Sequence, residues 1–225
     1  MTIDHTLGHR QRLKSRFIKA PKSLPDYEFL ELVLFNAIPR KDVKPLAKKL
    51  ITQFGNFAKV INSDDIKLKS FDNSITDAVI IQLEIIRESI ARILLGRIKE
   101  DVIISGARAL NDYLIATMSD LETEIFRIIY LNTKNHLIAD EINEYGTIDQ
   151  VHVYPREIVK RALFHGASAI ILVHNHPSGI PKPSEADVII TKKIINACKT
   201  IDVDVHDHII VGAHELFSFK ANELM

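Results

Sequence analysis

The stretch "ASAIILVHNHPSGIPKPSEAD", residues 167–187, decides the fold class of the second half of the chain. It opens with an apolar run rich in Ile and Val, which is typical of a strand buried on both faces. Turn-forming residues then interrupt the run, namely Pro177, Gly179, Pro181 and Pro183. An amphipathic pattern over 184–201 follows and predicts a helix. The stretch therefore predicts a buried strand, a turn and a returning helix.

The segments around this unit predict the rest of a sheet. "EIFRIIYLN" (124–132) and "HLIADEIN" (136–143) have the composition of strands and are separated by a short polar turn. We expect a helix at 155–166 and short strands at 204–212 and 214–220. This order indicates an α/β fold in which a mixed sheet is flanked by helices.

The first half of the chain has a different character. Apolar residues recur at helical spacing, most clearly along 74–96, where the pattern is expected to end at a glycine. We predict a small, basic, all-helical domain at 1–98, followed by the α/β domain at 103–225. Residues 1–99 carry 18 Lys and Arg against 11 Asp and Glu, and the rest of the chain carries the reverse. This asymmetry indicates either two units with different partners or two halves that dock onto each other.

Composition excludes several classes of protein. Cys198 is the single cysteine, so the chain has no internal disulfide, no C-x-x-C redox pair and no multi-cysteine zinc ribbon. No apolar run approaches the roughly 20 residues that span a bilayer, and the N-terminus is charged where a secretory signal is apolar. We therefore expect a cytoplasmic protein without a membrane span. Phosphate-binding loops, dinucleotide fingerprints, serine-hydrolase elbows and cytidine-deaminase motifs are all missing from the sequence.

The polar residues after the buried strand have the pattern of a metal site. His174 and His176 are two residues apart, so an extended chain directs both imidazoles to one side. Asp187 lies one turn into the returning helix, where its carboxylate can reach back toward them. Two imidazoles and one carboxylate are the ligand set of an open catalytic zinc site. Alternatively, Ser184 and Asp187 form a capping box that needs no metal, and Ser184 can also serve both purposes.

A second group of histidines offers another reading. His206 and His208 alternate along an expected strand, and Asp204 shares their side of it. They form either a second metal site or, as we favour, a polar strand face or outer support for the zinc ligands.

The stretch His174–Asp187 resembles the JAMM (MPN-plus) metalloprotease signature, His-x-His-Pro, six residues and then Ser-x-x-Asp, with every fixed position present. The flanking segments "YPREIVKRALFHGASAIILVHNHPSG" and "DHIIVG" resemble more narrowly the bacterial RadC group, historically labelled DNA repair proteins. The similarity covers 103–225 well and reaches the first half through "GHRQRLKSRF" and "AIPRKDVKPLAKKL". It implies a mixed sheet of the cytidine-deaminase-like or MPN type.

The resemblance also implies roles for individual residues. His174, His176 and Asp187 would bind Zn²⁺, and the metal would lower the pKa of its water toward about 7. Ser184 would hydrogen-bond that water or the oxyanion, and a glutamate on the first strand of the domain would act as general base. By position this base is Glu124.

Three other glutamates compete with Glu124 for the role of base: Glu122, Glu141 and Glu157. Glu157 falls in a helix, where a solvated acid or a favourable interaction with the helix dipole explains it better. Glu141 belongs to the second expected strand and is expected to be exposed.

Basic residues of the first half raise the possibility of DNA contact. The candidates are Arg10, Arg12, Lys14, Arg16, Lys41, Lys44 and Lys48. Such clusters can neutralise phosphates, although a solvated helix face is the usual explanation of a charge run and the one we favour. RadC-like proteins often resemble helix-hairpin-helix modules in this region, and those modules need a glycine-rich hairpin. "DNSITDAV" (72–79) has no glycine, which argues against DNA binding through backbone amides.

The leading hypothesis is a zinc-dependent hydrolase that cleaves a peptide or isopeptide-like amide of an unknown protein or peptide substrate. A DNA-associated repair or recombination protein, in which the second half serves as a docking module, is the alternative from another class. A nuclease that uses the same metal is a third possibility.

Overall fold

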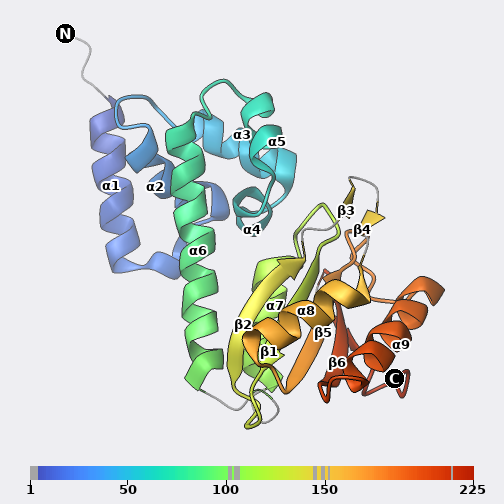
Figure 1. Ribbon diagram of the computed structural model, residues 1–225. Coiled ribbons are helices and arrows are strands. Elements are labelled where there is room, and N and C mark those ends of the chain that lie inside the picture. Colours follow the sequence, from blue (N-terminus) through green and yellow to red (C-terminus); the bar gives the residue numbers. More distant parts are fainter. Residues whose placement is uncertain are drawn as a thin grey trace. The chain divides into compact units, whose positions relative to one another are not determined.

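The computed structural model describes residues 5–100, 103, 107–143, 146–147, 150–151, 153–213 and 215–225. The chain divides into two compact units, Met1–Ser89 and Ile90–Met225, which are described separately (Figure 1). The linker predicted between residues 98 and 103 lies partly outside the described residues. Of the helices in the described segments, none combines the length and the apolar character needed to cross a membrane.

The first unit is helical, as the sequence predicts. Its helices are α1 (His5–Lys19), η1 (Pro21–Ser23), α2 (Asp26–Ala37), α3 (Lys44–Phe54), α4 (Phe57–Ile61), α5 (Asp65–Phe71) and the first half of α6 (Asp77–Glu100). Leucines that are fully shielded from solvent, such as Leu30, Leu34 and Leu50, form its core. Helix α6 continues past Gly96, where the sequence predicts its end, because Ile98 is buried in the core of the second unit.

The second unit is built on a five-stranded sheet with the order β2-β1-β5-β6-β7. Its strands are β1 (Phe126–Leu131), β2 (Leu137–Asn143), β5 (Ala169–Asn175), β6 (Asp204–Val211) and β7 (Leu216–Ser218). Only β5 and β6 are parallel, and the other neighbours are antiparallel. The mixed sheet confirms the predicted α/β class. A separate pair, β3 (Gly146–Thr147) and β4 (Gln150–Val151), was not predicted.

Helices cover both faces of this sheet (Figure 1). Helix α7 (Ala107–Met118) packs on one face, and α8 (Pro155–His165) and α9 (Glu185–Lys199) pack on the other. All seven residues of β5 are buried, which explains the continuous apolar run in its sequence.

The connection from β5 through α9 to β6 positions the polar residues that follow β5. His174 shares a side of the strand with Ile170 and Leu172, whose side chains pack in the core beneath α8 and α9. The first turn of α9 therefore comes back toward the end of β5, on the side that His174 faces.

Candidate metal centre

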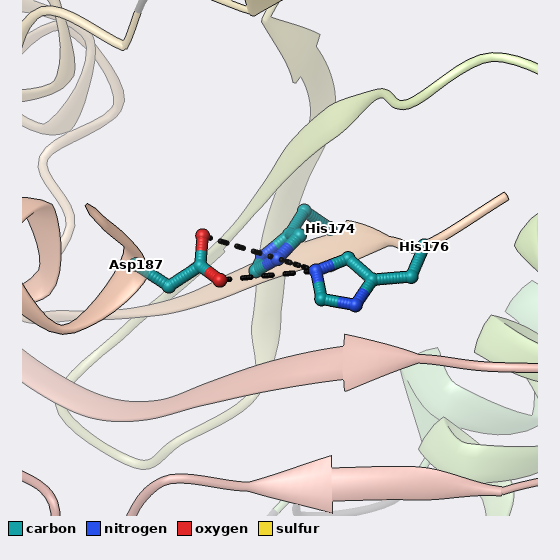
Figure 2. Close-up of side chains that lie close together, drawn as sticks. All are labelled: His174, His176 and Asp187. Carbon is teal, nitrogen blue, oxygen red and sulfur yellow. Dashed lines mark hydrogen bonds and ion pairs between the residues drawn. The ribbon is translucent and has the colours of Figure 1, made fainter. Parts of the chain in front are cut away.

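Three side chains that the sequence singles out meet beyond the end of β5. The Nε2 atoms of His174 and His176 lie 3.0 Å apart. Oδ1 of Asp187 is 3.5 Å from Nε2 of His174, and Oδ2 is 3.8 Å from Nε2 of His176. Figure 2 shows the carboxylate directed at the two imidazole rings. Among the described residues, this is the one group of three or more His, Cys, Asp and Glu side chains that could hold a metal ion.

The distances within this cluster fit a zinc ion. Ligand atoms about 2.0–2.2 Å from a tetrahedral zinc lie about 3.3–3.6 Å from one another. The separations of 3.0, 3.5 and 3.8 Å bracket that value. The chemistry of the donors also suits zinc, because imidazole nitrogen and carboxylate oxygen are among its usual ligands and three protein ligands leave one position open.

Asp187 is held in place by the start of α9. Ser184 is the N-cap, and its Oγ accepts a hydrogen bond from the Asp187 backbone amide at 3.1 Å. Oδ2 of Asp187 in turn accepts hydrogen bonds from the Ser184 amide and hydroxyl, both at 2.7 Å. The capping box is therefore present together with the cluster, and Asp187 belongs to both. Because the Ser184 hydroxyl donates its proton to Asp187, it can accept a hydrogen bond from a water but has no proton left for an oxyanion.

The turn after β5 fixes His176. Its Nδ1 lies 2.9 Å from the carbonyl oxygen of Ile180. Since a carbonyl only accepts, Nδ1 carries the proton, and a neutral His176 presents a bare Nε2 to the cluster. Gly179 in this turn has a φ of +79°. Gly212, which follows β6, packs against the turn, and a Cβ atom on Gly212 would lie 2.6 Å from the carbonyl oxygen of Gly179. The turn thus needs glycine at both positions.

Burial keeps His174 uncharged. The ring is 1% exposed, and burial lowers the pKa of His174 to about 4, with Asp187 opposing the shift and His176 adding to it. A neutral imidazole is the form that binds a metal.

Glu124, the expected general base, lies just before β1 and not on that strand, with Ile125 between them. Desolvation raises its pKa, nearby His176 lowers it and Asp187 raises it, so its charge is sensitive to both of these cluster members. Asn175 holds the backbone on both sides of it. The Asn175 Oδ1 accepts from the Ile125 amide at 2.9 Å, and its Nδ2 donates to the Thr123 carbonyl at 3.0 Å.

Two of the competing glutamates have other interactions. Glu141 accepts hydrogen bonds from Arg161 and contacts His165, and the Arg161 bond is the main reason its pKa is lowered. Glu157 lies in the first turn of α8 and contacts Arg156 and Lys160.

Comparison with known proteins agrees with these features. The RadC-like JAB domain family matches residues 104–224. The chain belongs to the RadC family. A UPF0758 protein of Ruegeria pomeroyi is 48% identical over 214 residues, which are 95% of each chain. A UPF0758 protein of Rhodobacter capsulatus is 44% identical over 214 residues, or 95% of this chain and 100% of the relative. The JAB domain and the His–His–Asp cluster together suggest metal-dependent hydrolysis.

The second histidine group of this RadC-family chain is split by a β-bulge. Ile170 pairs with Val205 and Ile171 pairs with Asp207, so His206 is left without a partner in the ladder. The alternation assumed from the sequence is therefore broken. His206 contacts Asn135 Oδ1 at 2.6 Å, whereas Nε2 of His208 lies 2.8 Å from Nδ1 of His174. Of the two readings, outer support is the one that fits His208.

Several basic residues of the first unit have structural partners. Arg10 donates to the carbonyls of Ile38 and Lys41, both at 2.6 Å. Arg16 pairs with Glu28 at 2.9 Å. Arg12, Lys14, Lys41 and Lys48 are exposed and Lys44 is half-buried. DNA contact through this surface stays a prediction.

Two residues next to the cluster were missed from the sequence. Asn175 sits between the two histidines, and Thr191 lies four residues after Asp187 on α9. The helical spacing of Thr191 is a local signal that places it on the same side as Asp187. No local pattern predicts that the Asn175 side chain reaches a segment 50 residues earlier in the chain.

Proposed function

We propose that this RadC-family protein is a zinc-dependent hydrolase that cleaves a peptide or isopeptide amide. The observation that carries the proposal is the convergence of two imidazole nitrogens and a carboxylate at zinc-like separations. JAB domains typically bind zinc, which supports this choice of metal. When bound, zinc supplies Lewis acidity and lowers the pKa of a coordinated water to about 7.

The protein's own residues would supply the remaining functions. Glu124 would accept the proton of the attacking water and deliver it to the leaving amine, which a carboxylate of raised pKa does well near neutral pH. Asn175 would hold Glu124 at the correct distance through its bonds on either side. Ser184 would orient the Asp187 carboxylate and, through its free lone pair, a water.

The ligand count favours an amide over a phosphodiester. Many metal-dependent nucleases use two ions about 3.5–4 Å apart to stabilise both the attacking and the leaving oxygen. The part of the chain that the structure describes offers one such cluster, with one carboxylate in it. A single metal beside a single general base is the arrangement of zinc peptidases.

Elemental analysis and hydrolysis assays test the proposal together. Protein purified without chelator or metal-affinity tag should hold about one zinc per chain in the wild type and in Glu124→Gln, and His174→Ala should lose it. Against a library of peptides and isopeptide-linked conjugates, Glu124→Gln should lose about 10²- to 10⁴-fold in rate. Glu157→Gln, on α8, is the matched control and should keep both properties. A wild type that stays free of metal after zinc is supplied would overturn the proposal.

A further inference from the structure

We propose that Thr191 and His208 form a hydrogen-bond relay that sets the tautomer of His174, so that its Nε2 faces the cluster with a bare lone pair. Both are positioning residues, because neither reaches the point where the three donors meet. The value of the relay for catalysis rests on the proposed function. The tautomer itself is a property of the metal-free protein and can be measured without any substrate.

The direction of the relay is determined at its start, on α9. Oγ1 of Thr191 lies 2.5 Å from the backbone carbonyl oxygen of Asp187. A carbonyl oxygen only accepts, so the single hydroxyl proton of Thr191 is committed to that bond. Oγ1 also lies 2.6 Å from Nδ1 of His208, and toward this atom it can now only accept. The proton of that bond must therefore sit on Nδ1 of His208.

The next step depends on His208 being neutral. Its side chain is 0% exposed, and the rings of Phe219 and Phe126 pack around it, with centroids 4.6 and 5.7 Å away. Within the described residues, the ring hydrogen-bonds only to Thr191 and His174. A positive charge enclosed in this way, without a carboxylate partner, carries a large desolvation cost. With its proton on Nδ1, a neutral His208 has a bare Nε2.

The relay ends at the cluster. Nε2 of His208 and Nδ1 of His174 are 2.8 Å apart, and the bare Nε2 requires Nδ1 of His174 to be the donor. A neutral His174 then has its lone pair on Nε2, the atom 3.0 Å from His176 Nε2 and 3.5 Å from Asp187 Oδ1. The opposite tautomer would place a proton in the space where a metal must bind.

The relay joins three elements that the fold already holds together. Thr191 is on α9, the helix that carries Asp187, and it lies one turn further along. His208 is on β6, where it pairs in register with Leu172 of β5, two residues before His174. The β-bulge at His206 determines which side of the sheet the later residues of β6 face. After the bulge, the His208 ring lies on the side of His174. The same contacts that build the sheet thus fix both the ligands and their protons.

The test removes only the hydroxyl group. Thr191→Val keeps the shape of the side chain, and Thr191→Ser keeps the hydroxyl. Thr117→Val is the matched control, because Thr117 makes the same type of helical bond, to the Tyr113 carbonyl at 2.8 Å. Histidine tautomers are read from ¹⁵N-detected correlations of zinc-free protein, and zinc affinity is measured by competition with a chelating dye.

The wild type, Thr191→Ser and Thr117→Val should show His174 protonated at Nδ1. In Thr191→Val, His208 loses its acceptor, so a population of His174 protonated at Nε2 should appear and zinc affinity should fall about 10- to 100-fold. The relay is wrong if His174 keeps the Nδ1 proton in Thr191→Val. If the wild type has the expected tautomer but binds no zinc, the relay stands and the proposed function fails. If the wild type binds zinc and His174 keeps its tautomer in Thr191→Val, the relay fails and the proposed function stands.

Discussion

Removing the Ser184 hydroxyl separates two roles that the sequence left open, helix capping and support of the metal site. Its Oγ accepts from the Asp187 amide and donates to the Asp187 carboxylate. The capping effect on stability depends on whether the first backbone amides of α9 still find a hydrogen-bond acceptor, either from the new residue or from water. Support of the carboxylate depends only on the hydroxyl. Ser184→Ala and Ser184→Gly therefore have different effects on stability and the same effect on metal binding.

The magnitudes follow from the exposed position of this cap. Replacing an N-cap serine with alanine costs about 1 kcal/mol, and replacing it with glycine costs about 0.3 kcal/mol. Ser184 is exposed, so water can reach the freed Asp187 amide and no penalty for a buried unpaired group is added. For a chain of this size, about 1 kcal/mol corresponds to a fall in Tm of about 2–4 °C. Asp187 keeps only its bond from the Ser184 backbone amide, so both variants should lose about 10-fold or more in zinc affinity.

Thermal and urea unfolding in the presence of a chelator measure the capping effect without any contribution from metal. Zinc competition on the same preparations measures the support of the carboxylate. The expected pattern is a stability order of wild type, Ser184→Gly and Ser184→Ala, with equal zinc affinities for the two variants. Equal stability of the two variants would refute the capping argument. Unchanged zinc affinity in both would refute the idea that the hydroxyl orients Asp187.

Three further predictions concern groups around the sheet. Asn175→Ala should keep zinc, measured by elemental analysis, but lose about 10²-fold in hydrolysis because Glu124 is no longer held in place. Since the bond from Arg161 lowers the pKa of Glu141, that carboxylate stabilises the fold above its unfolded value of 4.5, and the stabilisation is lost as pH falls through the folded pKa. Urea unfolding at pH 7 and pH 4 should therefore show a smaller loss of stability for Glu141→Gln than for the wild type. Cys198 is fully buried and burial raises its pKa to about 11, so iodoacetamide should label it only after unfolding, as mass spectrometry would show.

The parts of the site that sequence predicts are those joined by short stretches of chain. His174 and His176 share a strand end, and the capping pattern places Asp187 in the first turn of a helix that follows within a few residues. Periodicity and capping act over such distances, so strand, turn and helix can all be read from residues 167–187. The buried strand at the centre of the sheet was predicted for the same reason.

The parts that sequence does not predict depend on contacts between distant segments. His208 contacts His174, which is 34 residues earlier in the chain. The bulge at His206 also changes which side of the sheet each residue of β6 faces, compared with strict alternation. Helix α6 runs past Gly96 because Ile98 finds a buried position, which no helix-termination signal encodes. In each case tertiary packing outweighs a local rule.

The positions of the three donors are fixed by constraints that do not involve a metal. His174 is the last residue but one of a fully buried strand, Asp187 is held by the cap of α9, and His176 is held by the Ile180 carbonyl. A site of this kind is preorganised, so little of the free energy of metal binding goes into ordering the chain. The consequence is that two imidazole nitrogens and the two oxygens of one carboxylate face one another at 3.0 to 3.8 Å. Burial keeps the His174 ring neutral, which limits the repulsion, and the carboxylate is the one that the capping box already stabilises.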